Sequence, residues 1–146
     1  MGCPFMKENG KSKVILADRD GFYLQRLKRC LERKGEMQVQ GMTDSGPKLL
    51  ELAKDLQPDV ILFSCYIWNV EQLRQLVPVL KKILPNCVIG FGGPEVSYES
   101  EAFLRENPTV NLVMRGEGEL VFSDLLKHWN EGLPLSEVKG ITFRQD

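Results

Sequence analysis

Histidine is almost missing from this chain of 146 residues, and its four cysteines are widely separated. His128 is the single histidine, and no two of Cys3, Cys30, Cys65 and Cys87 lie within four residues of each other. Zinc fingers and iron–sulfur loops need such residues at close spacing, so we expect neither kind of metal site. No nucleophile–base–orienter set can be assembled around one histidine, so the chain is predicted not to be an enzyme by itself.

Long apolar runs and an excess of one charge are also lacking. No run approaches the roughly 20 residues needed to cross a bilayer. The formal net charge is −1, so no bulk field attracts nucleic acid or an anionic membrane. Residues 1–12 have no apolar region typical of a signal peptide and are expected to be a disordered leader. With Cys30, Cys65 and Cys87 expected as small, reduced core residues, these absences favour a cytoplasmic protein.

From residue 13 onward, short apolar segments alternate with amphipathic ones. Strands are predicted at 14–17, 37–41, 60–63, 88–91 and 112–114, with a small extra strand in the tail at 139–144. The connections are too short for anything but crossovers, which indicates a parallel sheet between helical layers. We therefore predict an α/β fold for residues 13–146. It is a single three-layer domain with a flavodoxin-like, doubly wound, five-stranded sheet of order 2-1-3-4-5, related to but shorter than the Rossmann fold.

In such sheets ligands bind beyond the carboxyl ends of the strands, and three loops there have unusual composition. Gly92 and Gly93 leave the backbone open to a ligand, and Pro94 fixes the direction in which the chain leaves. The same residues would suit an ordinary tight turn. Tyr66 and Trp68 are large aromatics where a loop is normally polar. They predict a ligand or partner surface, with packing against neighbouring loops as the alternative.

The loop at 116–119 places free backbone amides at the start of a helix. Gly116 and Gly118 have no side chains that would shield the backbone. Its N–H groups can therefore donate hydrogen bonds to amide or phosphate groups of a ligand. Glu117 and Glu119 would repel a bare phosphate, so a neutral, amide-rich or sugar-like ligand is favoured. Glu119 can also simply complement the helix dipole.

From about residue 58 to residue 144 the chain resembles the cobalamin-binding domain that precedes the catalytic barrel of many radical SAM proteins. The matching segments are 58–69, 92–98, 113–119 and 138–144. In that family the loops after the third, fourth and fifth strands line the corrin and its nucleotide tail. The resemblance therefore implies a cobalamin site formed by Ser64, Tyr66, Trp68, Gly92, Gly93, Pro94, Gly116, Glu117, Gly118 and Glu119.

The loop after the first strand departs from the better-known cobalamin proteins. Those place a cobalt-ligating histidine there, in an Asp-x-His-x-x-Gly motif, whereas this chain has Asp18, Arg19, Asp20 and Gly21. The resemblance implies an accessory domain that binds cobalamin without a histidine ligand. Its expected partner is a radical SAM barrel absent from this chain.

The first half of the chain resembles a response-regulator receiver domain instead. The segments that carry this resemblance are 14–20, 37–42 and 49–59. Asp18 and Asp20 could form the acidic pair that holds Mg²⁺ in receivers, but Ser64 stands at the phospho-acceptor position. Phosphoryl chemistry is therefore expected to be lost. The alternatives left open are a phosphorylation-defective, receiver-like interaction module and an engineered chimera that serves as a scaffold without a ligand.

Overall fold

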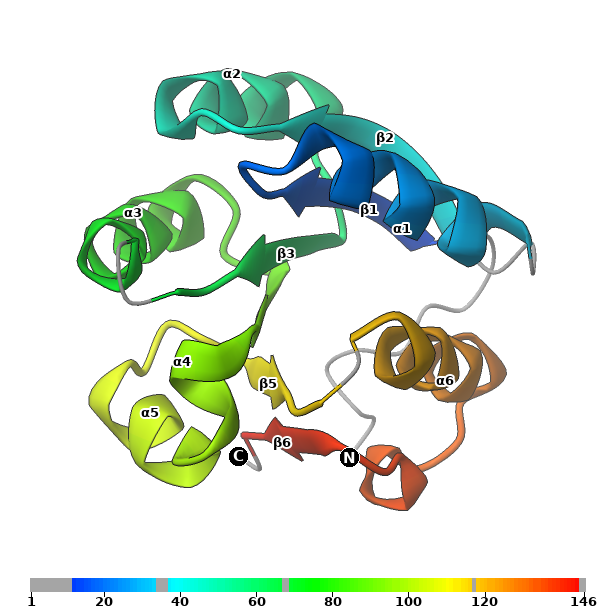
Figure 1. Ribbon diagram of the computed structural model, residues 1–146. Coiled ribbons are helices and arrows are strands. Elements are labelled where there is room, and N and C mark those ends of the chain that lie inside the picture. The colour runs from blue at the N-terminus through cyan, green and yellow to red at the C-terminus, as the bar shows by residue number, and fades with distance from the viewer. Residues whose placement is uncertain (1–11, 34–36, 67–68, 117, 145–146) are drawn as a thin grey trace.

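Six strands form one sheet in the computed structural model, and helices cover both of its faces (Figure 1). The structure describes residues 12–33, 37–66, 69–116 and 118–144. The strands are β1 (Ser12–Ala17), β2 (Met37–Thr43), β3 (Val60–Ser64), β4 (Val88–Gly92), β5 (Leu112–Met114) and β6 (Ile141–Phe143). The helices are α1 (Gly21–Arg33), α2 (Gly46–Leu56), α3 (Val70–Ile83), α4 (Pro94–Ser97), α5 (Ser100–Glu106), α6 (Gly118–Glu131) and the 3-10 turn η1 (Leu135–Glu137).

The strand order is β2-β1-β3-β4-β5-β6, with β1 to β5 parallel and β6 antiparallel to β5. The predicted order 2-1-3-4-5 is therefore confirmed. The predicted number of five strands is wrong, because the small strand expected in the tail joins the sheet, where Ile141 pairs with Met114 of β5. The first strand also starts at Ser12, inside the segment expected to be a leader, while residues 1–11 lie outside the described residues.

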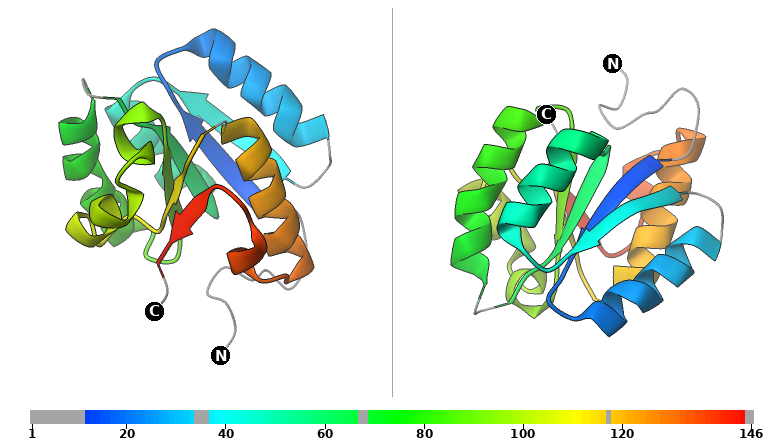
Figure 2. Two further views of the ribbon diagram at one scale, coloured as in Figure 1. Left: turned by 60° about the horizontal axis from the view of Figure 1, so that its bottom comes forward. Right: turned by 90° about the horizontal axis from the view of Figure 1, so that it is seen from above.

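Alternate residues of the central strands face opposite helical layers, which explains why these strands are apolar without interruption. Along β1, Val14 and Leu16 belong to the core cluster shared with α1 and α6. Ile15 belongs to the cluster on the other face, shared with α2, α3 and α5. Figure 2 shows these two layers on either side of the sheet. No helix within the described ranges is long and apolar enough to cross a membrane.

Side chains at the carboxyl edge of the sheet start the first two helices. Asp20 Oδ1 accepts hydrogen bonds from the backbone N–H groups of Phe22 and Tyr23, at 3.0 and 3.1 Å. Ser45 is the N-cap of α2 and accepts from Lys48 N at 3.4 Å. These bonds satisfy donors that have no partner inside a helix. The two helices therefore begin directly beside the strand ends.

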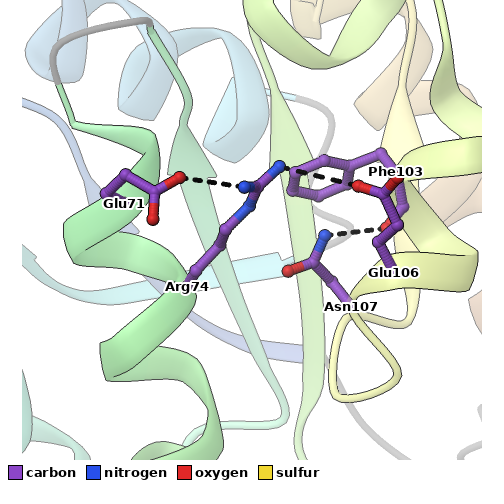
Figure 3. Close-up of polar contacts among 5 residues, drawn as sticks. All are labelled: Glu71, Arg74, Phe103, Glu106 and Asn107. Carbon is purple, nitrogen blue, oxygen red and sulfur yellow. Dashed lines mark hydrogen bonds and ion pairs between the residues drawn. The ribbon is translucent and has the colours of Figure 1, made fainter.

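A clamp joins α3 to α5 on one face of the sheet. The Arg74 guanidinium forms ion pairs with Glu71 at 2.9 Å and Glu106 at 3.9 Å, and it lies 5.6 Å from the ring centre of Phe103 (Figure 3). Phe103 packs in turn on Phe91 of β4, with ring centres 5.4 Å apart. Exposed ion pairs contribute little to stability, so the aromatic contacts are what hold α5 against the sheet.

Trp129 lies in the core, as the apolar stripe of the last helix predicts. The side chain is 5% exposed and belongs to the cluster between the sheet, α1 and α6. We expect Trp129→Phe to lower the free energy of unfolding by about 1–3 kcal/mol, because the smaller ring leaves space in a close-packed core. Urea unfolding measures this loss. Phe22→Leu, at a side chain that is 92% exposed, is the control and should change stability little. Equal losses in both variants would contradict this account of the core.

Candidate functional site

The loop after β3 is held by one asparagine. The Asn69 side chain donates to Ser64 O at 3.0 Å and accepts from Tyr66 N at 2.8 Å. The backbone N–H of Asn69 also donates to Tyr66 O, at 3.1 Å. Asn69 thus closes a tight loop that fixes Ser64 and Tyr66 beside the end of the strand. Ile67 and Trp68 lie outside the described residues.

The loops after β3 and β4 approach each other closely through backbone atoms. Cys65 N donates to Gly92 O at 2.7 Å, which extends the strand pairing by one residue. Gly93 has φ +110°, and a Cβ placed on it would lie 2.4 Å from Cys65 O. Gly93 is therefore required by the contact between the two loops. Gly92 is different, because an added Cβ would meet only the end of the Met114 side chain, at 3.5 Å.

A cavity of about 170 Å³ lies between the carboxyl half of the sheet, α1 and α6. We call it the α1–α6 cavity. Its lining from the sheet and loops is Leu16, Ala17, Leu62, Phe63, Ser64, Tyr66, Gly92, Gly93, Met114 and Gly116, and its lining from the helices is Tyr23, Leu24, Leu27 and Phe122. The walls are mostly apolar, and the polar groups lie towards the strand ends. The structure thus brings together Ser64, Tyr66, Gly92, Gly93 and Gly116 of the predicted site.

Pro94 is not among the residues that line this cavity, and the remaining predicted residues cannot be assigned to it from the described part of the chain. Pro94 is the first residue of α4, a one-turn helix that the sequence analysis did not anticipate, and its side chain is exposed. Gly118 and Glu119 begin α6, and their side chains are not described. Glu117, like Trp68, lies outside the described residues. Their part in the site remains a prediction.

The apolar lining from the helices was missed by the sequence analysis. Leu24 and Leu27 form part of the hydrophobic stripe of α1, and Phe122 belongs to that of α6. Periodicity assigns all three to a buried face, but it cannot distinguish a filled core from a lined cavity. The position of Leu24 in the sequence could have indicated its role. It lies in the first turns of the helix that follows β1, next to the carboxyl edge of the sheet, where ligands bind in such folds.

Burial determines the protonation of the two nucleophilic groups near this edge. Burial raises the pKa of Cys65 to about 12, with a smaller contribution from the charge of Glu95, so the thiol is protonated at neutral pH. Burial, followed by the negative charge of Asp18, raises the pKa of Tyr66 above 10.0. A protonated thiol is a poor metal ligand, so Cys65 acts as a packing residue.

His128 lies in the last turn of α6 and is largely buried. Its side chain is 13% exposed. Nδ1 lies 2.9 Å from Asp124 O, and Nε2 lies 3.9 Å from a carboxylate oxygen of Glu137. The imidazole therefore joins α6 to η1. In the described part of the chain, no group of three or more His, Cys, Asp or Glu side chains could hold a metal ion.

Comparison with known proteins gives a family match over most of the domain. A family model described as B12 binding domain matches residues 22–126. This match extends on both sides of residue 58, where the resemblance to the cobalamin-binding domain was expected to begin. It therefore also covers most of the first half, which resembles a receiver domain.

Curated relatives point the same way. The cobalamin-dependent radical SAM methyltransferase TokK of Streptomyces tokunonensis is 35% identical over 71 residues, which are 49% of this chain and 10% of that protein. An anaerobic magnesium-protoporphyrin IX monomethyl ester cyclase of Cereibacter sphaeroides is 29% identical over 110 residues, or 72% of this chain and 18% of that protein. The chain thus spans only a small part of these relatives.

Solved structures of two kinds share the fold. The cobalamin-dependent S-adenosylmethionine radical enzyme OxsB, with aqua-cobalamin and S-adenosylmethionine bound, matches with a TM-score of 0.78 at 20% identity, over 93% of this chain and 21% of that chain. The isolated REC domain of RcsB from Salmonella enterica serovar Typhimurium in its apo form matches with a TM-score of 0.69 at 16% identity, over 86% of this chain and 95% of that chain. The flavodoxin-like expectation is confirmed.

The receiver likeness predicts a negative result with phosphoryl donors. Ser64 ends β3, where the receiver resemblance places a phospho-acceptor aspartate, and its carbonyl is held by Asn69. Mg²⁺ demands several hard oxygen ligands, which Asp18 and Asp20 alone do not supply. We expect acetyl phosphate with Mg²⁺ to leave the intact mass unchanged. A stable aspartyl phosphate would revive the receiver interpretation.

The two buried thiols predict a loss of stability in alkaline solution. Burial raises the pKa of Cys65 and, with a smaller effect of Asp59, that of Cys87 from 9.0 to about 12 in the folded chain. Above the unfolded value the unfolded chain loses these protons while the folded chain keeps them. Their contribution to stability is therefore complete below pH 9.0 and falls as the pH rises towards about 12.

The measurement is urea unfolding at neutral pH and at pH about 10.5. The double variant Cys65→Ala, Cys87→Ala should lose less stability over this interval than the parent chain. Cys30→Ala, at a half-buried cysteine, is the matched control and should keep the parent's dependence. If the double variant lost as much unfolding free energy between the two pH values as the parent, the buried thiols would not be the cause of the alkaline loss.

Proposed function

The chain belongs to the B12-binding domain family, whose cofactor is cobalamin, and we propose that the α1–α6 cavity takes the nucleotide tail of that cofactor. The observation that carries this assignment is an apolar hollow at the carboxyl edge of the sheet, open beside Gly92 and Gly116. The tail ends in an aromatic base, which an apolar cavity can bury. The amide-rich corrin would then lie over the loops after β3, β4 and β5.

The cavity has a suitable size and lining. Its volume is about 170 Å³. An apolar cavity of about 150 Å³ is known to stay dry and to bind benzene. Burial of an aromatic ring between Leu24, Leu27 and Phe122 would remove apolar surface from water, which is favourable. The polar groups of Ser64 and Tyr66 lie at the rim, where they could orient the polar part of the ligand.

The residue at the family's histidine position already has another role. Asp20 Oδ1 accepts from two N–H groups of the first turn of α1, so this carboxylate is used as a helix cap. The use of Asp20 as a helix cap supports a mode of cobalamin binding in which this position gives cobalt no protein ligand. Bound cobalamin would supply the cobalt chemistry, and the residues of this chain would bind and orient the cofactor.

We further propose that the domain serves a radical SAM partner, as the names of TokK and OxsB indicate for those proteins. Three large apolar side chains follow strand ends and are exposed, Phe22 by 92%, Tyr98 by 94% and Leu120 by 68%. Single exposed apolar residues are common, but three around one edge are consistent with a surface that another domain covers. On this proposal the chain carries the cofactor and the partner carries out the reaction.

Filling the cavity tests the site. In Gly92→Val the new side chain would point towards Met114 and occupy the space assigned to the tail. We expect the parent chain to retain the visible bands of hydroxocobalamin after desalting. The variant should bind cobalamin at least about tenfold more weakly, a difference of 1.4 kcal/mol. Cobinamide, which lacks the nucleotide tail, should bind the parent and the variant alike.

The matched control is Gly41→Val in β2, where an added Cβ meets only the ends of the Leu52 and Leu56 side chains, at 3.4 and 3.5 Å. It should bind cobalamin like the parent. A parent chain that retains no corrinoid would contradict the proposed function. A Gly92→Val variant that binds cobalamin normally would contradict the tail assignment.

A further inference from the structure

At the carboxyl edge of the sheet, one buried carboxylate oxygen accepts no hydrogen bond from the described residues. Asp18 directly follows β1 and is 9% exposed. Its Oδ1 accepts from Asp20 N at 3.0 Å, whereas its Oδ2 is covered and has no hydrogen-bond partner among the described residues. Leaving a buried carboxylate oxygen unpaired costs free energy, and native proteins rarely do so without a reason. A donor that arrives with a ligand would remove this cost.

Asp18 lines a groove on the face of the sheet opposite the α1–α6 cavity. The groove has a volume of about 620 Å³ and lies between α2 and α3, with Leu49 and Leu73 among its apolar walls. We call it the α2–α3 groove. Its size falls within the range of about 300–1,000 Å³ that is usual for small-molecule sites. It shares Ala17 and Ser64 with the α1–α6 cavity, so the two hollows meet at the ends of β1 and β3.

We propose that the α2–α3 groove is a second part of the corrinoid site, in which Asp18 Oδ2 accepts a hydrogen bond from the corrin side of the cofactor. This inference rests on the proposed function. Two groups of the cofactor share the necessary chemistry, the N–H of a corrin carboxamide and the O–H of a cobalt-bound water. The torsion of an aspartate carboxylate about Cβ–Cγ is broad, so a small rotation can turn Oδ2 towards the groove.

The charges around Asp18 are compatible with this role. Arg19 and Asp44 line the α2–α3 groove, and Asp20 lies at the start of α1 with its Oδ1 used as a cap. Burial, followed by the charge of Asp18, raises the pKa of Tyr66, so the Tyr66 hydroxyl lies within the field of Asp18 and is protonated at neutral pH. A carboxylate shielded from water accepts more strongly than an exposed one. Asp18 is therefore the strongest acceptor that the groove offers to a ligand.

The binding test replaces the charge and keeps the shape. We expect Asp18→Asn to bind hydroxocobalamin and cobinamide about tenfold to hundredfold more weakly, which is the range for a lost hydrogen bond to a charged group. Both probes should lose affinity equally, because both carry the corrin. The equal loss distinguishes Asp18→Asn from Gly92→Val, which should weaken the binding of cobalamin but not that of cobinamide. Asp55→Asn removes an exposed carboxylate of α2 that does not line the groove, and this matched control should bind both probes like the parent.

Stability without ligand distinguishes an acceptor for the cofactor from a structural residue. We expect ligand-free Asp18→Asn to unfold at the same or a higher urea concentration than the parent, because the unpaired buried charge is gone. Saturating hydroxocobalamin should then stabilise the parent more than the variant. A ligand-free variant that is clearly less stable than the parent would overturn the proposal in favour of a structural role.

A spectroscopic titration identifies the donor. If the donor is cobalt-bound water, Asp18→Asn should lower the pKa of that water in the visible spectrum, because the carboxylate favours its protonated form. If the donor is a carboxamide, this pKa should be the same in both chains while the affinity still falls. Either result supports the acceptor role and names the group.

The failure of this inference is distinct from that of the proposed function. A parent chain that binds hydroxocobalamin and an Asp18→Asn variant that binds it equally well would overturn the role of Asp18 and leave the function intact. A parent chain that binds neither probe would overturn the function itself.

Discussion

The reversal of winding between β1 and β3 is the constraint on which the rest of this structure depends. The chain leaves β1 through α1 on one face of the sheet and leaves β3 through α3 on the other. In the described part of the chain these two connections turn to opposite faces of the sheet, which leaves a gap at the carboxyl ends of the two neighbouring strands. Doubly wound sheets place their ligands at such a gap. Both hollows of this domain meet at this point.

The two sides of the gap differ in chemistry because alternate residues of a strand face opposite layers. Leu16 and Leu62 point towards α1 and α6, where they form an apolar wall. Asp18 follows the last residue of β1, where the alternation of the strand has ended, and it brings a carboxylate to the groove beside α2 and α3. A ligand that has both an aromatic base and polar amides can use both sides at once. Cobalamin is such a ligand, and the described residues present the two environments without a side-chain cluster that could hold a metal ion.

Hydrogen bonds and one close backbone contact join the described parts of the loops at this edge. The Cys65–Gly92 hydrogen bond and the close approach of Gly93 to Cys65 O join the loops after β3 and β4. Asn69 closes the loop that carries Tyr66. Ligand contacts placed on such loops lose little conformational freedom on binding, which favours affinity. Gly93 shows why loop composition alone was ambiguous, since its missing side chain makes room for protein backbone.

The sequence by itself determined the alternation of strands and helices, the strand order and the sheet edge at which we propose that the ligand binds. Short continuous apolar runs such as 60–63 favour strands buried on both faces, and short crossovers leave few arrangements. The tertiary structure decided that the tail strand joins the sheet, that Leu24, Leu27 and Phe122 line a cavity, and that Asp18 Oδ2 lacks a partner. Hydrophobic periodicity reports which face of an element is buried. Whether that face meets another side chain, an empty space or an unpaired charge depends on residues distant in the chain, and only their packing settles it.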